Sequence, residues 1–301
     1  MILLRVSALI WLSGILLSQG LISGPSQAVA ETASTTSTLT APSSDARATR
    51  IAFRRPNSRA DSILLKDLVS GKTLYQYKAD RRLSPASLTK IMSALIILDY
   101  GHLDEPVTVS RYAASAPKIR LKLRAGEVWR LNSLLKAMLM ASANDACRAA
   151  VQHVAGSEAR FVELMNTKAR ALGLPDTRFR NACGFDARGH YSTALDLARL
   201  SEVAMQHSTF RSLVGREFDI ITALNADRSH LLRNTNQLLG RIPGVEGVKT
   251  GFTSRAGRCL VAKVSQEGKE LLLVLLNAKR RWSTARLLIN YGLDLVEDSP
   301  R

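Results

Sequence analysis

Several features that define other classes of protein are missing from this 301-residue sequence. Beyond residue 30, no stretch is both long and apolar enough to cross a bilayer, which argues against a multi-span membrane protein. No segment repeats at a fixed period, which argues against a repeat architecture. Zinc-finger spacing, an RNA-binding signature and a basic zipper are also absent, so the common nucleic-acid-binding modules are not indicated.

Cysteine is scarce, with only Cys147, Cys183 and Cys259. Their separations match no metal-ligand pattern, and we predict neither a metal site nor an organic cofactor. In an oxidising compartment, this odd count allows at most one disulfide and leaves one thiol over. The interpretation we favour from the sequence is that they are small buried hydrophobic side chains, with any pairing among them left open.

Acidic residues are also few, because 42 Lys and Arg stand against 25 Asp and Glu, a formal net charge of +17. The densest basic stretch is KIRLKLR at 118–124. Such a balance favours an acidic partner, such as nucleic acid, an anionic membrane surface or an anionic polymer. Because the N-terminus indicates export, we expect no nucleic-acid partner.

The N-terminus carries the features of an export signal. Arg5 precedes an uncharged, mainly apolar stretch, and Ala28-Val29-Ala30 has the small-x-small pattern of a cleavage site. We therefore expect a signal peptide at residues 1–30, with an uncleaved membrane anchor as the alternative. In either case the rest of the chain is exported to the periplasm or cell envelope, with peripheral or no membrane association after signal removal. Residues 31–57 are rich in Ser and Thr, which predicts a flexible linker.

The remaining sequence predicts both strands and helices. Residues 62–77 predict a β-hairpin, and 258–278 predict two antiparallel strands around a turn. Between them, apolar residues recur at three- and four-residue spacing, which predicts helices at 131–141, 145–156, 157–174 and 193–207, and a last helix follows at 282–297. The order predicts an α+β fold, in which both chain ends build an antiparallel sheet flanked by helices, with a helical lobe beside it. We expect a site in the cleft between lobe and sheet.

Three short motifs stand out: Ser87-Leu88-Thr89-Lys90, Ser142-Ala143-Asn144 and Lys249-Thr250-Gly251. The first opens a predicted helix, where residues three apart are neighbours on one face. Taken alone, a serine beside a lysine is more often a solvated surface pair than a nucleophile beside a base. Each of the other two motifs is equally common by chance, so only their combination is specific.

In this order and behind an export signal, the motifs resemble the S-x-x-K, S-D-N and K-T-G set of penicillin-binding proteins and class A β-lactamases. Ala143 stands where that set has Asp. The chain is similar, over about residues 58–298, to the low-molecular-weight penicillin-binding proteins, the D-alanyl-D-alanine carboxypeptidase family of serine peptidases. The resemblance implies a DD-peptidase/β-lactamase-like fold and a catalytic domain at 58–298, with no C-terminal β-domain.

The resemblance also implies an activity. We expect an exported carboxypeptidase that removes the terminal D-alanine from peptidoglycan stem peptides through an acyl-enzyme, in cell-wall synthesis and cell shape. β-Lactam antibiotics are expected to acylate the same serine. An endopeptidase that cuts peptidoglycan cross-links is the alternative, because the motifs do not discriminate between the two activities.

Each motif residue receives a role from the family. Ser87 is the nucleophile, placed near the positive end of a helix, and Lys90 can take its proton if burial and a second cation lower the pKa of the lysine. By resemblance, Ser142 relays a proton to the leaving amine. The substrate-binding residues are expected to be Asn144, Lys249, Thr250, Gly251 and Phe252, with the backbone N–H groups of Ser87 and Phe252 forming the oxyanion hole.

Rival interpretations are weaker. Class A β-lactamases use a Glu-activated water for deacylation, and no Glu lies between Ala171 and Leu200, so slow release of a penicilloyl group is expected. A non-catalytic peptidoglycan-binding protein is disfavoured because every polar motif residue is present. His190 lies near no G-x-S-x-G serine and is expected to be structural. A basic cluster after the last strand could contact a carboxylate, but a solvated face is favoured for Lys279, Arg280, Arg281 and Arg286.

Overall fold

The computed structural model describes residues 59–100 and 102–297. The predicted signal peptide at 1–30 and the linker at 31–57 lie outside the described residues. A five-stranded antiparallel sheet has the order β2-β1-β9-β8-β7. Its strands come from both chain ends, as predicted: β1 (Ser62–Asp67), β2 (Thr73–Tyr77), β7 (Val245–Thr253), β8 (Gly257–Gln266) and β9 (Lys269–Leu276).

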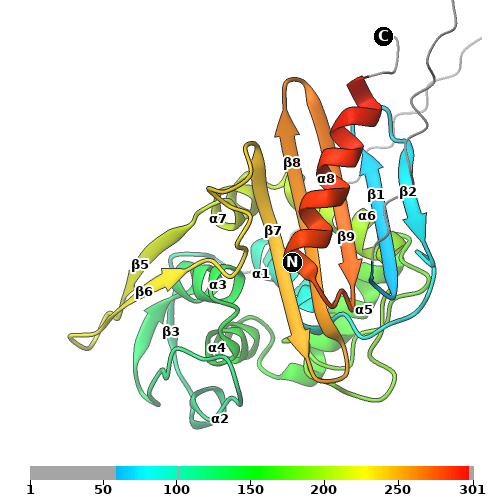
Figure 1. Cartoon of the computed structure of the whole chain (residues 1–301). Coiled ribbons are helices and arrows are strands. Elements are labelled where there is room, and N and C mark those ends of the chain that lie inside the picture. Colours follow the sequence, from blue (N-terminus) through cyan, green and yellow to red (C-terminus); the bar gives the residue numbers. More distant parts are fainter. Residues whose placement is uncertain (1–58, 101, 298–301) are drawn as a thin grey trace, which may run out of the picture. The chain divides into compact units, whose positions relative to one another are not determined.

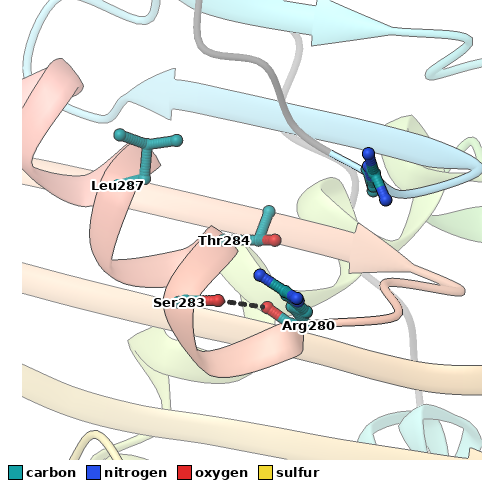
Figure 2. Close-up of a pocket in the computed structure, with 5 residues that line it drawn as sticks. Arg280, Ser283, Thr284 and Leu287 are labelled. Carbon is teal, nitrogen blue, oxygen red and sulfur yellow. Dashed lines mark hydrogen bonds between the residues drawn. The ribbon is translucent and has the colours of Figure 1, made fainter.

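Helices cover both faces of this sheet (Figure 1). Side chains alternate along β1, so that Ile63 and Leu65 pack with α8 (Arg281–Glu297) while Leu64 joins the core on the opposite face, against which α6 (Ala194–Gln206) packs. Because β9 is likewise buried on both faces, its sequence is an almost continuous apolar run. The outer side of α8, with Ser283 and Leu287, borders a surface depression (Figure 2).

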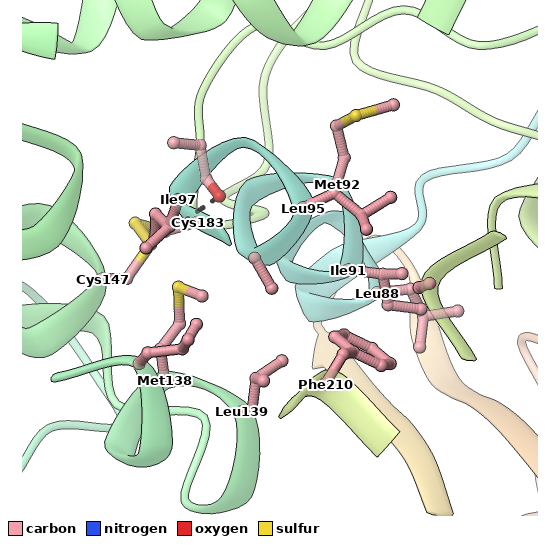
Figure 3. Packing of buried hydrophobic residues seen from close by; sticks show 14 of the residues in the cluster. Leu88, Ile91, Met92, Leu95, Ile97, Met138, Leu139, Cys147, Cys183 and Phe210 are labelled. Atoms are coloured by element: carbon pink, nitrogen blue, oxygen red, sulfur yellow. Dashed lines mark hydrogen bonds between the residues drawn. A yellow bond between two sulfur atoms is a disulfide. The ribbon is translucent and has the colours of Figure 1, made fainter. Parts of the chain in front are cut away.

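The helical lobe surrounds α1 (Lys90–Tyr100), which follows the 3₁₀ turn η1 (Ala86–Thr89). Figure 3 shows Leu88, Ile91, Met92 and Leu95 on this segment, packed among side chains from the rest of the lobe. The lobe also contains α2 (Arg111–Ala114), α3 (Leu131–Met140), α4 (Asn144–Ala155), α5 (Glu158–Ala171) and α7 (Ser208–Val214). Although α1 is buried on most sides, no helix among the described residues is long and apolar enough to traverse a bilayer.

Two small hairpins were not predicted from the sequence. One pairs β3 (Pro106–Thr108) with β4 (Val128–Arg130), and the other pairs β5 (Phe218–Thr222) with β6 (Ser229–Arg233). The β5–β6 hairpin buries Ile221 and Leu232 against the lobe and leaves the other face in solvent. Its outer face includes Phe218, Ile220 and Leu231.

Candidate active site

Ser87 lies on the 3₁₀ turn η1 and not, as predicted, on the first turn of an α-helix. A 3₁₀ helix has three residues per turn, so residues three apart lie directly above one another. Ser87 and Lys90 are therefore stacked, and Lys90 Nζ lies 3.0 Å from Ser87 Oγ. Ser87 is half-buried and accessible, whereas Lys90 is completely buried.

The hydrogen-bond partners of Lys90 determine whether its amine can accept the proton of the Ser87 hydroxyl. Nζ donates hydrogen bonds to Asn144 Oδ1 at 2.8 Å and to the Cys183 carbonyl oxygen at 2.6 Å. A neutral amine has two N–H groups and one lone pair, and both carbonyl oxygens can only accept. The lone pair is thus left facing the Ser87 hydroxyl. Burial, and secondarily the charge of Lys249, hold the pKa of Lys90 well below its ordinary value, which favours this neutral form.

The third motif lies on β7, the edge strand of the sheet. This strand packs against η1, which carries the predicted nucleophile Ser87 and is called the nucleophile turn. A Cβ atom added to Gly251 would lie 3.0 Å from the Pro85 carbonyl oxygen and 3.2 Å from the Ser87 nitrogen. Only a glycine lets the strand approach this closely. Lys249 is buried and lies two residues before Gly251 on the same strand. Burial, with a smaller effect from Arg281, lowers the pKa of Lys249 to about 7. The charge of Lys249 contributes to the lowered pKa of Lys90, as expected for two amines that lie near each other.

The second motif forms the loop between α3 and α4. Ser142 is buried and has a positive φ of 59°, and Asn144 opens α4. The Asn144 amide is fixed at both ends, since its Nδ2 donates to the Pro117 carbonyl oxygen at 3.0 Å while its Oδ1 accepts from Lys90. Asp145 accepts from the backbone N–H groups of Leu121 and Leu123, so the basic 118–124 segment is anchored beside the loop.

Two further residues support β7 and were not singled out from the sequence. Thr235 Oγ1 lies 2.6 Å from Thr250 Oγ1, which fixes the hydroxyl expected to hold a carboxylate. Arg281 Nη1 donates to the carbonyl oxygens of Gly251 at 3.1 Å and Cys259 at 3.0 Å. The favoured interpretation of Arg281 as part of a solvated face is therefore wrong, whereas Lys279, Arg280 and Arg286 are exposed as expected. Phe252, next along β7, has a side chain that is 56% exposed.

This geometry can be compared with known proteins. The sequence model of the D-alanyl-D-alanine carboxypeptidase family matches residues 49–280. The chain belongs to this family. It is 35% identical over 249 residues to the D-alanyl-D-alanine carboxypeptidase DacF of Bacillus subtilis, covering 80% of this chain and 64% of that protein. It therefore spans just under two thirds of the length of that relative.

Two other comparisons are informative. A D-alanyl-D-alanine endopeptidase of Escherichia coli is 32% identical over 231 residues, covering 74% of this chain and 73% of that protein. The crystal structure of a penicillin-binding protein of Listeria monocytogenes in its ampicillin-bound form superposes with a TM-score of 0.70 at 29% identity. That match covers 80% of this chain and 100% of the Listeria chain. The similarity confirms the predicted α+β fold of the DD-peptidase type.

In this family member a disulfide joins Cys147 on α4 to Cys183. The favoured reading of both as small buried hydrophobic side chains is wrong, while the expected maximum of one disulfide is confirmed and Cys259 is the free, buried thiol. Cys147 lies one helical turn after Asn144, and Cys183 supplies the other carbonyl that binds Lys90. The cross-link therefore connects the two backbone segments that hold the lysine. Closing a loop of 36 residues is worth about 3–4 kcal/mol of stability in the chain-entropy model.

His190 is hydrogen-bonded to Thr89, the last residue of the nucleophile turn. Its Nδ1 accepts from the Arg180 backbone N–H at 3.2 Å, so the proton is on Nε2, which donates to Thr89 Oγ1 at 2.9 Å. Burial lowers the pKa of His190 to about 4, which keeps the ring neutral. The ring bonds a threonine and no nucleophilic serine, in agreement with a structural role. No cluster of metal-ligating side chains occurs among the residues that the structure describes.

We expect Gly184→Ala to disable the candidate active site. Gly184 has a φ of +84°, and an added Cβ would lie 2.1 Å from the Ala86 carbonyl oxygen and 2.9 Å from the Ser87 nitrogen. The nucleophile turn would have to move, and displacement of a catalytic group by about 1 Å can cost about 10²-fold in rate. Acylation by a fluorescent penicillin measures the loss.

Gly71→Ala is the matched control. Gly71 has a similar φ of +73° but no atom within 4 Å of the added Cβ. It should incur only the backbone cost of about 1–2 kcal/mol and leave acylation unchanged. Equal acylation rates in Gly184→Ala and the wild type would show that the close contact of Gly184 with the nucleophile turn does not set the position of Ser87.

Proposed function

We propose that the chain is a serine-type D-alanyl-D-alanine carboxypeptidase of the cell envelope that acts on peptidoglycan stem peptides. The observation that carries this proposal is the position of Lys90 Nζ, which has two carbonyl acceptors on one side and the Ser87 hydroxyl on the other. An amine held in this way is a base directed at one hydroxyl. Such a pair performs acyl transfer without a histidine.

In the acylation step, Lys90 takes the Ser87 proton while Oγ attacks the carbonyl carbon of the penultimate D-alanine. The negative charge that develops on the carbonyl oxygen is expected to be stabilised by the backbone N–H groups of Ser87 and Phe252, each worth about 10²–10³ in rate. Collapse of the tetrahedral intermediate breaks the peptide bond. Protonated Lys90 passes its proton through Ser142 to the leaving amine, which restores the neutral lysine, and terminal D-alanine departs.

Lys249 and Thr250 are proposed to bind the carboxylate of that D-alanine. A protonated Lys249 supplies the charge, and Thr250 supplies a hydroxyl whose position is fixed by Thr235. Asn144 is proposed to orient the substrate amide as well as Lys90. Water then hydrolyses the acyl-enzyme and restores Ser87.

The same steps account for penicillin. A β-lactam carbonyl would acylate Ser87, and no Glu lies between Ala171 and Leu200 to activate a hydrolytic water in the manner of a class A β-lactamase. We therefore propose a slowly released penicilloyl enzyme. The ampicillin-bound form of the Listeria protein supports the binding of a penicillin at this type of site.

The second candidate is an endopeptidase that cuts D-alanyl cross-links. It is favoured by the similarity to the Escherichia coli endopeptidase, of which this chain covers 73%. The reaction at Ser87 is the same in both cases, and only the size of the leaving group differs.

Product analysis separates the two activities. Purified monomeric pentapeptide muropeptides and cross-linked dimers are incubated with the protein, and the products are resolved by chromatography. Release of D-alanine from monomers supports the carboxypeptidase, whereas conversion of dimers to monomers supports the endopeptidase. If the protein does neither and also fails to bind fluorescent penicillin covalently, the proposal is wrong.

The pH profile tests the role proposed for Lys249. Its pKa is lowered to about 7, so the charged form is lost as the pH rises through that value. Because kcat/KM reports the pKa values of the free enzyme, kcat/KM for a peptide with a free terminal carboxylate should fall about tenfold per unit above pH 7. Deprotonation of Lys90 produces the opposite, rising limb at lower pH.

A matched ester or thioester substrate without a terminal carboxylate provides the control for this profile. It does not need the Lys249 charge, so its alkaline limb should be absent or much weaker. The same alkaline limb for both substrates would mean that another group controls the decline.

Location is part of the proposal. The small-x-small pattern at Ala28-Val29-Ala30 supports export, and relatives of this family act on a polymer outside the cytoplasm. We propose residence in the periplasm or cell envelope, with signal removal after residue 30 and a linker at 31–57.

A further inference from the structure

Three surface depressions adjoin one another through shared lining residues, and together they are called the groove. The first lies between the β5–β6 hairpin and the segment that enters β7, and the second lies between that segment and α8. Gln237 and Arg241 line both of them. The third lies at the start of α8 and shares Ser283 and Leu287 with the second (Figure 2). Their volumes of about 580, 450 and 300 Å³ fall in the range of small-molecule sites, so each could hold one unit of a chain-like ligand.

Arginines dominate the charge of this groove. Five line it, all exposed, and no ion pair among the described residues involves any of them: Arg59, Arg233, Arg241, Arg280 and Arg286. Glu217 is the single acidic lining residue. Some arginines elsewhere in the described structure, such as Arg82, Arg216 and Arg228, are paired with carboxylates, and others are not, so the groove is distinguished by the number of unpaired arginines that line adjoining depressions. A row of unpaired guanidinium groups favours a ligand that carries several negative charges.

Apolar side chains accompany the arginines at both ends of the groove. Phe218 and Leu231 line the first depression and are 71% and 53% exposed, and Leu287 lines the other two and is 46% exposed. Exposed apolar groups beside cations are typical of interaction sites. The apolar faces of sugar rings pack well on such side chains, and carboxylates on the same polymer can reach the arginines.

The groove is physically connected to the active site. Asn234 and Asn236 line its first depression, and Thr235 between them contacts the Thr250 hydroxyl. A polymer seated in the groove is therefore held next to the strand proposed to bind the stem-peptide carboxylate. The geometry points to a binding site for a further stretch of the peptidoglycan polymer, whose sugar rings would pack on the apolar side chains and whose stem-peptide carboxylates would reach the arginines. Binding there would retain the polymer while its stem peptides are processed. This inference rests on the proposed function, and it assigns to the groove the polymeric part of the substrate.

A bilayer with anionic headgroups is the other ligand that basic and apolar side chains could attract. A chain-like polymer fits better, because the arginines line connected depressions and do not form a flat or protruding surface.

Charge reversal in the groove tests the inference. In the triple variant Arg233→Glu, Arg241→Glu, Arg286→Glu, binding to purified, lipid-free peptidoglycan sacculi should weaken by at least about tenfold in co-sedimentation. Because the contacts are exposed, binding of the wild type should also weaken with added salt. The triple Arg→Lys variant at the same positions should retain binding within about threefold, which shows that charge is the cause.

The control triple Lys72→Glu, Arg111→Glu, Arg160→Glu makes the same change in net charge at three exposed sites outside the groove. It should bind sacculi within about twofold of the wild type. Equal losses in both triples, or none in the groove triple, would overturn the inference. So would a wild type that is not retained by sacculi, or a groove triple that loses only binding to anionic phospholipid vesicles. If the glutamate triple melts early, the corresponding Arg→Gln triple takes its place.

Two soluble assays separate failure of this inference from failure of the proposed function. Acylation by fluorescent penicillin and turnover of a soluble pentapeptide depend on Ser87 and Lys90 and should be unchanged in the groove triple. D-Alanine release from intact sacculi should fall together with sacculus binding. A wild type that binds sacculi but is neither acylated nor active on the peptide would refute the proposed function and leave the groove as a binding site.

Discussion

Ser87→Ala is expected to abolish covalent labelling by penicillin and to lower peptide turnover by about 10⁶-fold, the scale seen when a serine nucleophile is removed. In the proposed mechanism this hydroxyl is the acyl acceptor, and Lys90 Nζ has no other hydroxyl among its hydrogen-bond partners in the described structure. The variant should fold normally, because Ser87 is half-buried and its side chain contributes little to the core. Gel fluorescence after incubation with labelled penicillin, and a melting curve, measure the two effects.

Ser84→Ala is the control for this substitution. Ser84 lies three residues earlier and is also half-buried, and its single side-chain contact is a long 3.5 Å bond to Asp186. It should label like the wild type. Labelling that persists in Ser87→Ala would move the nucleophile to another serine and contradict the mechanism.

Lys90→Met should lower the acylation rate by about 10⁴-fold, at the upper end of the contribution of a general base. Methionine fills the space of the lysine stem but cannot accept a proton. The substitution also leaves Asn144 Oδ1 and the Cys183 carbonyl oxygen without their donor, which costs about 1–3 kcal/mol for each group. A measurable fall in melting temperature should therefore accompany the kinetic loss. Stopped-flow labelling gives the rate.

Lys72→Met controls for the loss of a lysine as such, because Lys72 is exposed in the β1–β2 turn. It should change neither the rate nor the melting temperature. Lys90→Met should also lack the acid limb of the wild-type pH profile, since the group that titrates there has been removed. Retention of that limb would show that Lys90 is not the base.

The sequence predicted the sheet and the three motifs for identifiable reasons. Strands β8 and β9 contain the apolar segments 259–262 and 271–276, separated by a polar stretch with the turn at Glu267-Gly268, and α3, α4 and α5 repeat apolar residues at helical spacing. The serine, the two lysines and the asparagine belong to short local motifs. Such patterns are visible in a single sequence because each depends on residues a few positions apart.

The supporting contacts could not be predicted in the same way. Arg281 binds carbonyls 22 and 30 residues away, and Thr235, in the loop that follows β6, reaches Thr250 on β7. The pairing of Cys147 with Cys183 depends on where helix α4 meets a distant loop, which spacing alone does not define. The 3₁₀ geometry at Ser87 was missed because its four residues continue into an α-helix without a break in the apolar pattern.

The disulfide between Cys147 on α4 and Cys183 makes the structure around Lys90 depend on the redox state of the compartment. In a reducing cytoplasm both cysteines would remain thiols. A newly synthesised copy would therefore lack the cross-link between the two segments that hold Lys90. If the chain is exported as proposed, the disulfide would form only after secretion. The two segments that hold Lys90 would then be cross-linked only in the compartment where the proposed substrate lies.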